Sequence, residues 1–118
     1  MPKTTVEAVS RQEVYDAFQQ LYQQLSEGYW ASTTIDAKDR IRGLADAVSE
    51  ILTELNRDDI ESRSNDFKAL TETVKGINPR LDTLGKEIDQ VIHAVKTGQN
   101  VAKAIDKAIS LAVKYFKI

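Results

Sequence analysis

The sequence predicts an all-α protein: an antiparallel bundle of four to five helices with heptad seams, forming a single helical domain over residues 1–118. Apolar residues recur three and four positions apart along most of the chain, which is the spacing of one helix face. Strand-like alternation is missing. Leu, Ile, Val and Phe make up 31 of the 118 residues, well above the roughly 20% typical of disordered chains, so the chain can bury a core.

The first helix is expected over residues 11–27. Ser10 and Glu13 have the spacing of a capping box, in which each side chain accepts a hydrogen bond from a free backbone N–H of the other. Gly28 is expected to end this helix, because glycine readily adopts the left-handed conformation that terminates helices. Residues 1–9 are expected to form a frayed arm. The seam consists of Val14, Phe18, Leu21 and Leu25.

The second helix is expected over residues 35–55, with Thr34 as its N-cap and Asn56 as its stop. Asp36 in the first turn suits the positive end of the helix dipole. The apolar positions alternate three and four apart, which is a heptad pattern. They are Ile41, Leu44, Val48, Ile51 and Leu55.

The third and fourth segments lie in one heptad register, which leaves two interpretations open. Asp58 is expected to cap a helix that runs to about residue 77, and a second helix would follow from Pro79 to about residue 97. Gly76 and Pro79 favour a break between them, since glycine ends helices and proline begins them. The alternative is one long helix over 59–97, kinked at Pro79. The register comprises residues 60, 67, 74, 81, 88 and 95.

The last helix is expected over residues 101–118, with Gly98 ending the helix before it and Asn100 as its cap. It is cationic: residues 93–118 carry a net charge of +4, whereas residues 1–92 carry −6. Its polar side chains fall within an arc of about 100° on a helical wheel. The lysines of this narrow stripe are Lys103, Lys107, Lys114 and Lys117.

Two interpretations of this amphipathic C-terminal helix remain open. A cationic stripe beside a wide apolar surface is typical of helices that lie on an anionic membrane, where Tyr115 and Phe116 would sit at the headgroups. The same pattern is typical of the most buried helix of a bundle. Besides these two, the stripe could bind an acidic partner or nucleic acid; the pI of about 5.4 and the lack of a helix-turn-helix signature argue against nucleic acid.

Four aromatic residues form a second candidate contact region. Tyr15, Tyr22 and Tyr29 are seven residues apart, so they share one face of the first helix. Trp30 follows in the expected loop after that helix. Such residues either rim a core or form an interaction stripe for a partner.

Composition argues against chemistry at a catalytic, cofactor or metal site. The chain has no Cys and a single His, so thiol chemistry and sites needing two imidazoles are excluded. That residue, His93, falls at an exposed heptad position. The acidic residues near Asp58 lack the spacing of a Ca²⁺ loop. We therefore expect neither catalysis nor a bound cofactor or metal.

The sequence thus predicts a non-catalytic helical interaction or assembly protein, an adaptor, scaffold or chaperone-like module that acts through an exposed helical face. We expect a protein partner of unknown identity and a homo-oligomer. The alternative is a peripheral membrane-binding or pore-forming protein that uses residues 101–118. No signal peptide or membrane-spanning stretch is evident, so a cytoplasmic location is expected, with peripheral membrane association under the alternative.

Overall fold

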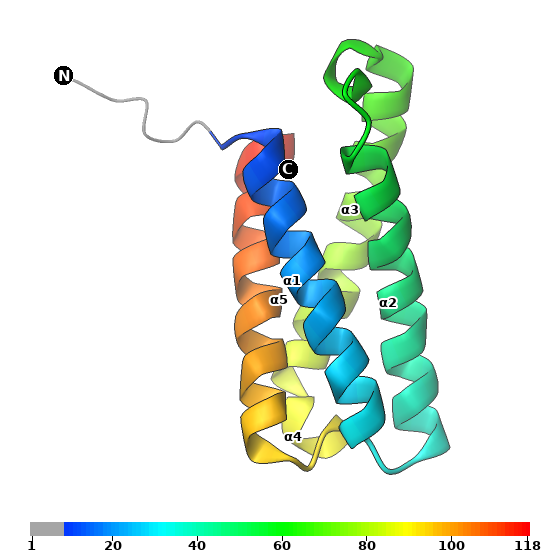
Figure 1. Cartoon of the computed structure of the whole chain (residues 1–118), viewed down its shortest axis with the longest axis vertical. Coiled ribbons are helices and arrows are strands. Elements are labelled where there is room, and N and C mark those ends of the chain that lie inside the picture. The colour runs from blue at the N-terminus through cyan, green and yellow to red at the C-terminus, as the bar shows by residue number, and fades with distance from the viewer. Residues whose placement is uncertain (1–8) are drawn as a thin grey trace, which may run out of the picture.

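A computed structural model describes residues 9–118 as four long helices joined by short connections (Figure 1). Two short helical turns lie within these connections. The expected arm over 1–9 lies outside the described residues apart from Val9, which packs against the core. The long helices are α1 (Arg11–Ala31), α2 (Ile35–Leu55), α3 (Ser64–Lys86) and α5 (Val95–Phe116), and the turns are η2 (Ile60–Ser62) and α4 (Ile88–Val91).

Consecutive long helices run in opposite directions and form a four-helix bundle. α1 packs against α2 and α5, and α3 also packs against α2 and α5. α2 and α5 therefore occupy opposite corners of the bundle, at the right and left edges of Figure 1. The prediction of an all-α antiparallel bundle is confirmed.

Most of the predicted seam positions lie in the core. Val95, the last position of the predicted register, is instead 69% exposed, because α3 ends at Lys86 and Val95 begins a new helix. All apolar seam positions named for the first two helices are buried. The predicted caps also form: Ser10 and Glu13 make the reciprocal capping box, and the Thr34 hydroxyl accepts the backbone N–H of Ala37. α1 and α2 thus begin where a polar cap precedes an apolar stripe, as the sequence indicated.

The first helix does not end at Gly28, contrary to the prediction. α1 continues to Ala31, and no glycine in residues 9–118 has a positive φ. Gly28 is instead a point of close approach, because a Cβ atom there would lie 2.8 Å from Cδ1 of the buried Ile92. The helix ends at Ser32, whose hydroxyl and backbone N–H both donate to the carbonyl of Tyr29.

The third helix begins later than predicted, at Ser64, and Asp58 does not cap it. Ile60 is fully buried, and the chain turns through the 3₁₀ helix η2 to place it in the core. Arg57 then spans the turn, donating to Glu54 of α2 at 2.7 Å and to Asp66 of α3 at 3.0 Å. The burial of Ile60 and the ion pairs of Arg57 therefore place the start of α3 at Ser64, whereas the local capping signal had suggested a start directly after Asp58.

The predicted break at Gly76 and Pro79 is absent, since α3 runs through both residues. Both lie on the exposed face of the helix, so water can reach the carbonyl of Lys75, whose N–H partner proline lacks. On the opposite face the seam stays buried and holds the helix together. That seam comprises Leu70, Val74, Ile77, Leu81 and Leu84.

The alternative of one helix over 59–97 is also wrong, because α3 ends at Lys86. Residues 92–94 reverse the chain, and α5 begins at Val95 rather than at 101. Gly98 and Asn100 therefore lie inside α5, without the stop and cap roles expected of them. Gly98 is buried, and a Cβ atom there would lie 3.5 Å from Cγ1 of Ile88. The preceding turn therefore packs closely against the start of α5.

We predict that Gly76→Ala stabilises the protein by about 0.5–1 kcal/mol, because Gly76 lies within an exposed helix and has open space around its Cα. Chemical denaturation measures the change. Gly28→Ala serves as the comparison and should give a lower stability than Gly76→Ala, owing to the contact with Ile92. A loss of stability from Gly76→Ala would indicate a helix end at this residue and contradict a continuous α3.

Candidate functional site

An aromatic groove between α1 and α2 is the best candidate for a functional site. Trp30, on the last turn of α1, is 79% exposed. With Tyr22 and Tyr29 it lines a surface cavity of about 390 Å³, whose other wall includes Arg42 and Asp46 of α2. We call this cavity the Trp30 groove.

Contacts with Lys38 fix the aromatic end of the groove. The Lys38 ammonium donates to the carbonyl of Tyr29 at 2.7 Å and lies over two rings, 4.6 Å from the centroid of Tyr29 and 5.6 Å from that of Trp30. The two rings pack edge to face, with centroids 5.2 Å apart. Cation–π and aromatic contacts of this kind hold Trp30 in place although it is exposed.

The structure gathers three of the four predicted aromatic residues. Tyr22, Tyr29 and Trp30 line the groove. Tyr15 does not; it is half-buried and packs against the core. The seven-residue spacing correctly placed the tyrosines on one side of α1, but only the packing of α2 decides which of them border a cavity.

The four predicted lysines of α5 are all exposed, and none forms an ion pair within residues 9–118. The apolar side of α5 is turned into the bundle. Insertion of this side into a membrane would require α5 to leave the core. Its buried residues are Gly98, Val101, Ala104, Ile105, Ala108, Ala112 and Phe116.

Tyr115 and Phe116, the other candidate membrane contacts, lie in an aromatic cluster with Phe67 of α3. The Tyr115 hydroxyl donates to Oε2 of Glu61 at 2.6 Å, which joins the end of α5 to η2. Partial burial, together with this hydrogen bond, raises the pKa of Tyr115 above its ordinary value of 10.0. Both residues thus hold the end of α5 against the connection between α2 and α3.

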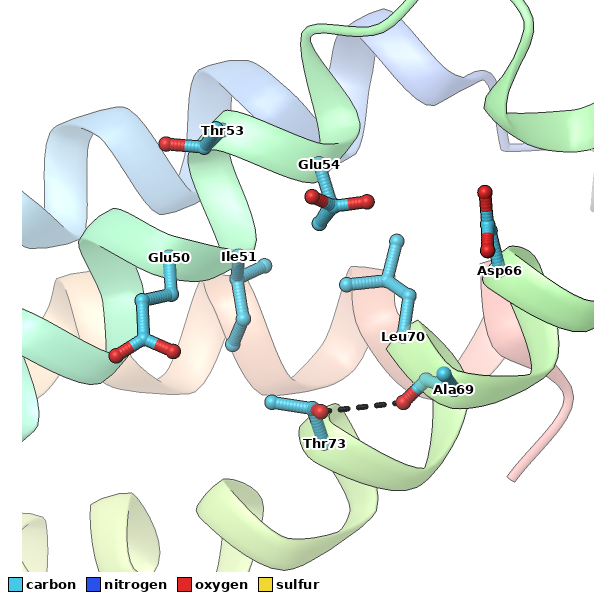
Figure 2. Close-up of a pocket in the computed structure, with 8 residues that line it drawn as sticks. All are labelled: Glu50, Ile51, Thr53, Glu54, Asp66, Ala69, Leu70 and Thr73. Carbon is cyan, nitrogen blue, oxygen red and sulfur yellow. Dashed lines mark hydrogen bonds between the residues drawn. The ribbon is translucent and has the colours of Figure 1, made fainter.

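A second groove, between α2 and α3, was not predicted from the sequence. Figure 2 shows its rim of carboxylates from Glu50, Glu54 and Asp66, with Ile51 and Leu70 between them. The cavity has a volume of about 320 Å³. Glu50 and Glu54 are one turn apart on α2, a spacing that the sequence shows, whereas Asp66 joins them only through tertiary packing.

Two of the three carboxylates of this groove are paired with a cation. Arg57 pairs with both Asp66 and Glu54, and these hydrogen bonds raise the pKa of Arg57 itself. Within the described part of the chain, no three acidic or histidine side chains are placed to hold a metal ion. His93 is exposed, as predicted.

The hydropathy of the helices and the comparisons with known proteins add two findings. None of the helices within residues 9–118 combines the length and apolar character needed to cross a bilayer. No protein-family model, curated protein or solved structure matches this chain. The case for function therefore depends on the geometry of these surfaces.

We predict that Ile105→Ala lowers the free energy of unfolding by about 2–5 kcal/mol, because Ile105 is fully buried in α5. Lys103→Ala, two residues away on the exposed side, should change it by less than about 0.5 kcal/mol. Urea denaturation followed by circular dichroism measures both values. Equal, small effects of the two substitutions would show that α5 is not part of the core in solution.

We predict that Tyr115→Phe reduces the pH dependence of stability in alkaline solution. Because the pKa of Tyr115 is raised on folding, the unfolded chain loses this proton first. The free energy of unfolding should therefore fall as pH rises above about 10 in the wild type. The substitution should flatten this fall, because it removes the group whose pKa is raised. An identical slope in Tyr115→Phe and wild type would contradict the hydrogen bond to Glu61.

Proposed function

We propose that the protein is a non-catalytic interaction module that binds a protein partner through the Trp30 groove. The observation that carries the proposal is the 79% exposure of Trp30 beside a cavity. Trp, Tyr and Arg are the residues that most often dominate the energy of protein–protein contacts. The groove presents all three types, with Trp30, Tyr22 and Tyr29 on α1 and Arg42 on α2.

The groove is also held in shape before any partner arrives. Lys38 fixes the rings of Tyr29 and Trp30, so binding would sacrifice little side-chain freedom. The cavity lies at the lower end of the roughly 300–1,000 Å³ typical of small-molecule sites. An apolar side chain from a partner helix or loop suits this space, while Arg42 and Asp46 offer polar contacts at its edge.

Trp30 supplies its own test, since it is the single tryptophan in the chain. Partner proteins are first captured on the immobilised protein, and a purified partner is then titrated while Trp30 fluorescence is followed. Binding should shift the emission to shorter wavelength as the ring becomes buried. Trp30→Ala, followed by a label-free method, should weaken binding about 30-fold or more, as expected for a dominant contact residue.

The matched control is Val95→Ala. Val95 is 69% exposed at the same end of the bundle but does not line the groove, so its substitution should leave binding unchanged. A partner that binds wild type and Trp30→Ala equally well would show that the groove is not the contact surface. Failure to capture any partner would also count against the proposal.

A further inference from the structure

Two rows of unpaired charge lie on opposite corners of the bundle. The outer face of α2 carries an acidic row of Asp36, Asp39, Asp46 and Glu50. The lysine row consists of Lys103, Lys107 and Lys114 on the outer face of α5 and Lys117 at its C-terminal cap. All eight side chains are exposed. Within the part of the chain that the structure describes, none of them forms an ion pair.

The unpaired rows contrast with the connection between α2 and α3. There the charges neutralise one another, as Arg57 pairs with Glu54 and Asp66, and Arg63 with Asp59. The side chains of the acidic row and of the lysine row are therefore free to form ion pairs with another molecule.

The two rows match each other residue by residue when the helices lie antiparallel. Aligning Lys103 with Glu50 places Lys107 opposite Asp46, because both steps are one turn of four residues. The same alignment places Lys114 opposite Asp39 and Lys117 opposite Asp36. Three of these opposite-charge pairs, at Lys103, Lys107 and Lys114, form over about 17 Å of helix with no shift in register. Lys117 follows as the residue that ends α5, with a φ of 58°.

The residues between these pairs also fit. Ser110 of α5 falls opposite Gly43 of α2 in this register, so small residues meet where the two backbones are closest. Gly43 is exposed, and a Cβ atom there would make only an ordinary contact, 3.7 Å from a guanidinium nitrogen of Arg80. No parallel alignment of the two rows opposes more than two lysines to acidic residues of the row. The complementarity thus selects one direction and one register.

These rows cannot meet within one molecule, because α2 and α5 are separated by α1 and α3. A two-fold dimer cannot satisfy both rows either, since its interface would need α2 and α5 on one face. Each molecule must therefore offer α2 to one neighbour and α5 to another. α2 and α5 of one molecule run in the same direction (Figure 1), so each neighbour must be inverted relative to the last.

We propose that the partner of the lysine row of α5 is the acidic row of α2 on a second, inverted copy of this chain. The contact is heterologous, so repetition builds a chain of alternately inverted molecules or a closed ring of an even number of them. The acidic row shares Asp46 with the edge of the Trp30 groove, but the lysine row does not border that groove. Lys107→Glu/Lys114→Glu therefore tests the association without altering the groove, and Trp30→Ala tests the groove without altering either row.

Ion pairs between exposed side chains are screened by salt. The protein should therefore associate at about 0.01 M ionic strength, where the Debye length is about 30 Å. It should be monomeric at about 1 M, where that length is about 3 Å. Sedimentation velocity over a range of concentrations measures the average mass. A monomer at every concentration in low salt would overturn the proposal.

A charge exchange tests the pairing directly. Lys107→Glu/Lys114→Glu reverses the two central charges of the lysine row, and Asp39→Lys/Asp46→Lys reverses the two central charges of the acidic row, so two of the four pairs become repulsive in each variant. Each variant alone should be monomeric in low salt. An equimolar mixture should regain the association, because the two reversed positions on α5 of one variant now face the two reversed positions on α2 of the other, and all four pairs are again of opposite charge. A mixture that stays monomeric would overturn the proposed contact.

The matched control is Lys68→Glu/Lys75→Glu, which changes the net charge of the chain by the same amount. Lys68 and Lys75 are exposed and lie on α3, outside both rows. This variant should associate like the wild type. If it becomes monomeric as the row variant does, net charge and not the row drives association, and the proposal fails. Circular dichroism confirms that every variant is folded.

The absence of Cys from the chain permits a test of the register. Ser110→Cys mixed with Gly43→Cys should form a mixed disulfide dimer in low salt, and much less in high salt. Ser110→Cys mixed with Ser49→Cys should form little, because Ser49 lies more than one turn away from the opposing position. Equal cross-linking of the two mixtures would contradict the register.

Anionic vesicles of phosphatidylserine and phosphatidylcholine provide the competing outcome. Under our proposal the wild type gains mass in low salt without vesicles, and Lys107→Glu/Lys114→Glu removes that gain. If the wild type stays monomeric but floats with anionic vesicles, and the variant does not, the lysine row binds a lipid surface. That result would replace the second copy as its partner.

Discussion

Burial of one apolar stripe from each of four helices is the constraint on which this structure depends. α1 lies between α2 and α5, and α3 closes the ring on the far side, so no seam is left open. The close approach of Ile92 to Gly28 fits the last connection against the end of α1. Because a chain of this size buries only about two thirds of its surface, almost every large aliphatic side chain is used for this purpose.

The surfaces that remain are the source of both proposals. The core occupies the apolar side of α5, so the lysines are what that helix presents outside. Trp30 is a large aromatic residue that the fold leaves exposed, and the Lys38 ammonium packs over its ring. An interaction protein needs such features, because it must keep a stable interior while offering residues whose burial awaits a partner.

The helix boundaries show which sequence patterns predict a helix end correctly and which do not. Ser10, Thr34 and Asn56 act where predicted, since a cap needs only its own neighbouring backbone groups. Gly28, Gly76 and Gly98 do not end helices, because packing of the surrounding seams outweighs the weak local preference of glycine. The start of α5 carried no capping signal at all; Ala94 precedes it, and burial of Ile92 turns the chain there.

The sequence by itself determined the fold class, most core positions and the lysine row, because helical periodicity depends only on spacing along the chain. It also named the aromatic residues of the Trp30 groove. Only the tertiary structure decided that Tyr15 lies outside this groove, that Asp66 joins Glu54 through Arg57, and that the two charge rows face away from each other. These arrangements depend on contacts between different helices. The spacing of side chains along one helix does not determine which other helix that side of it will pack against.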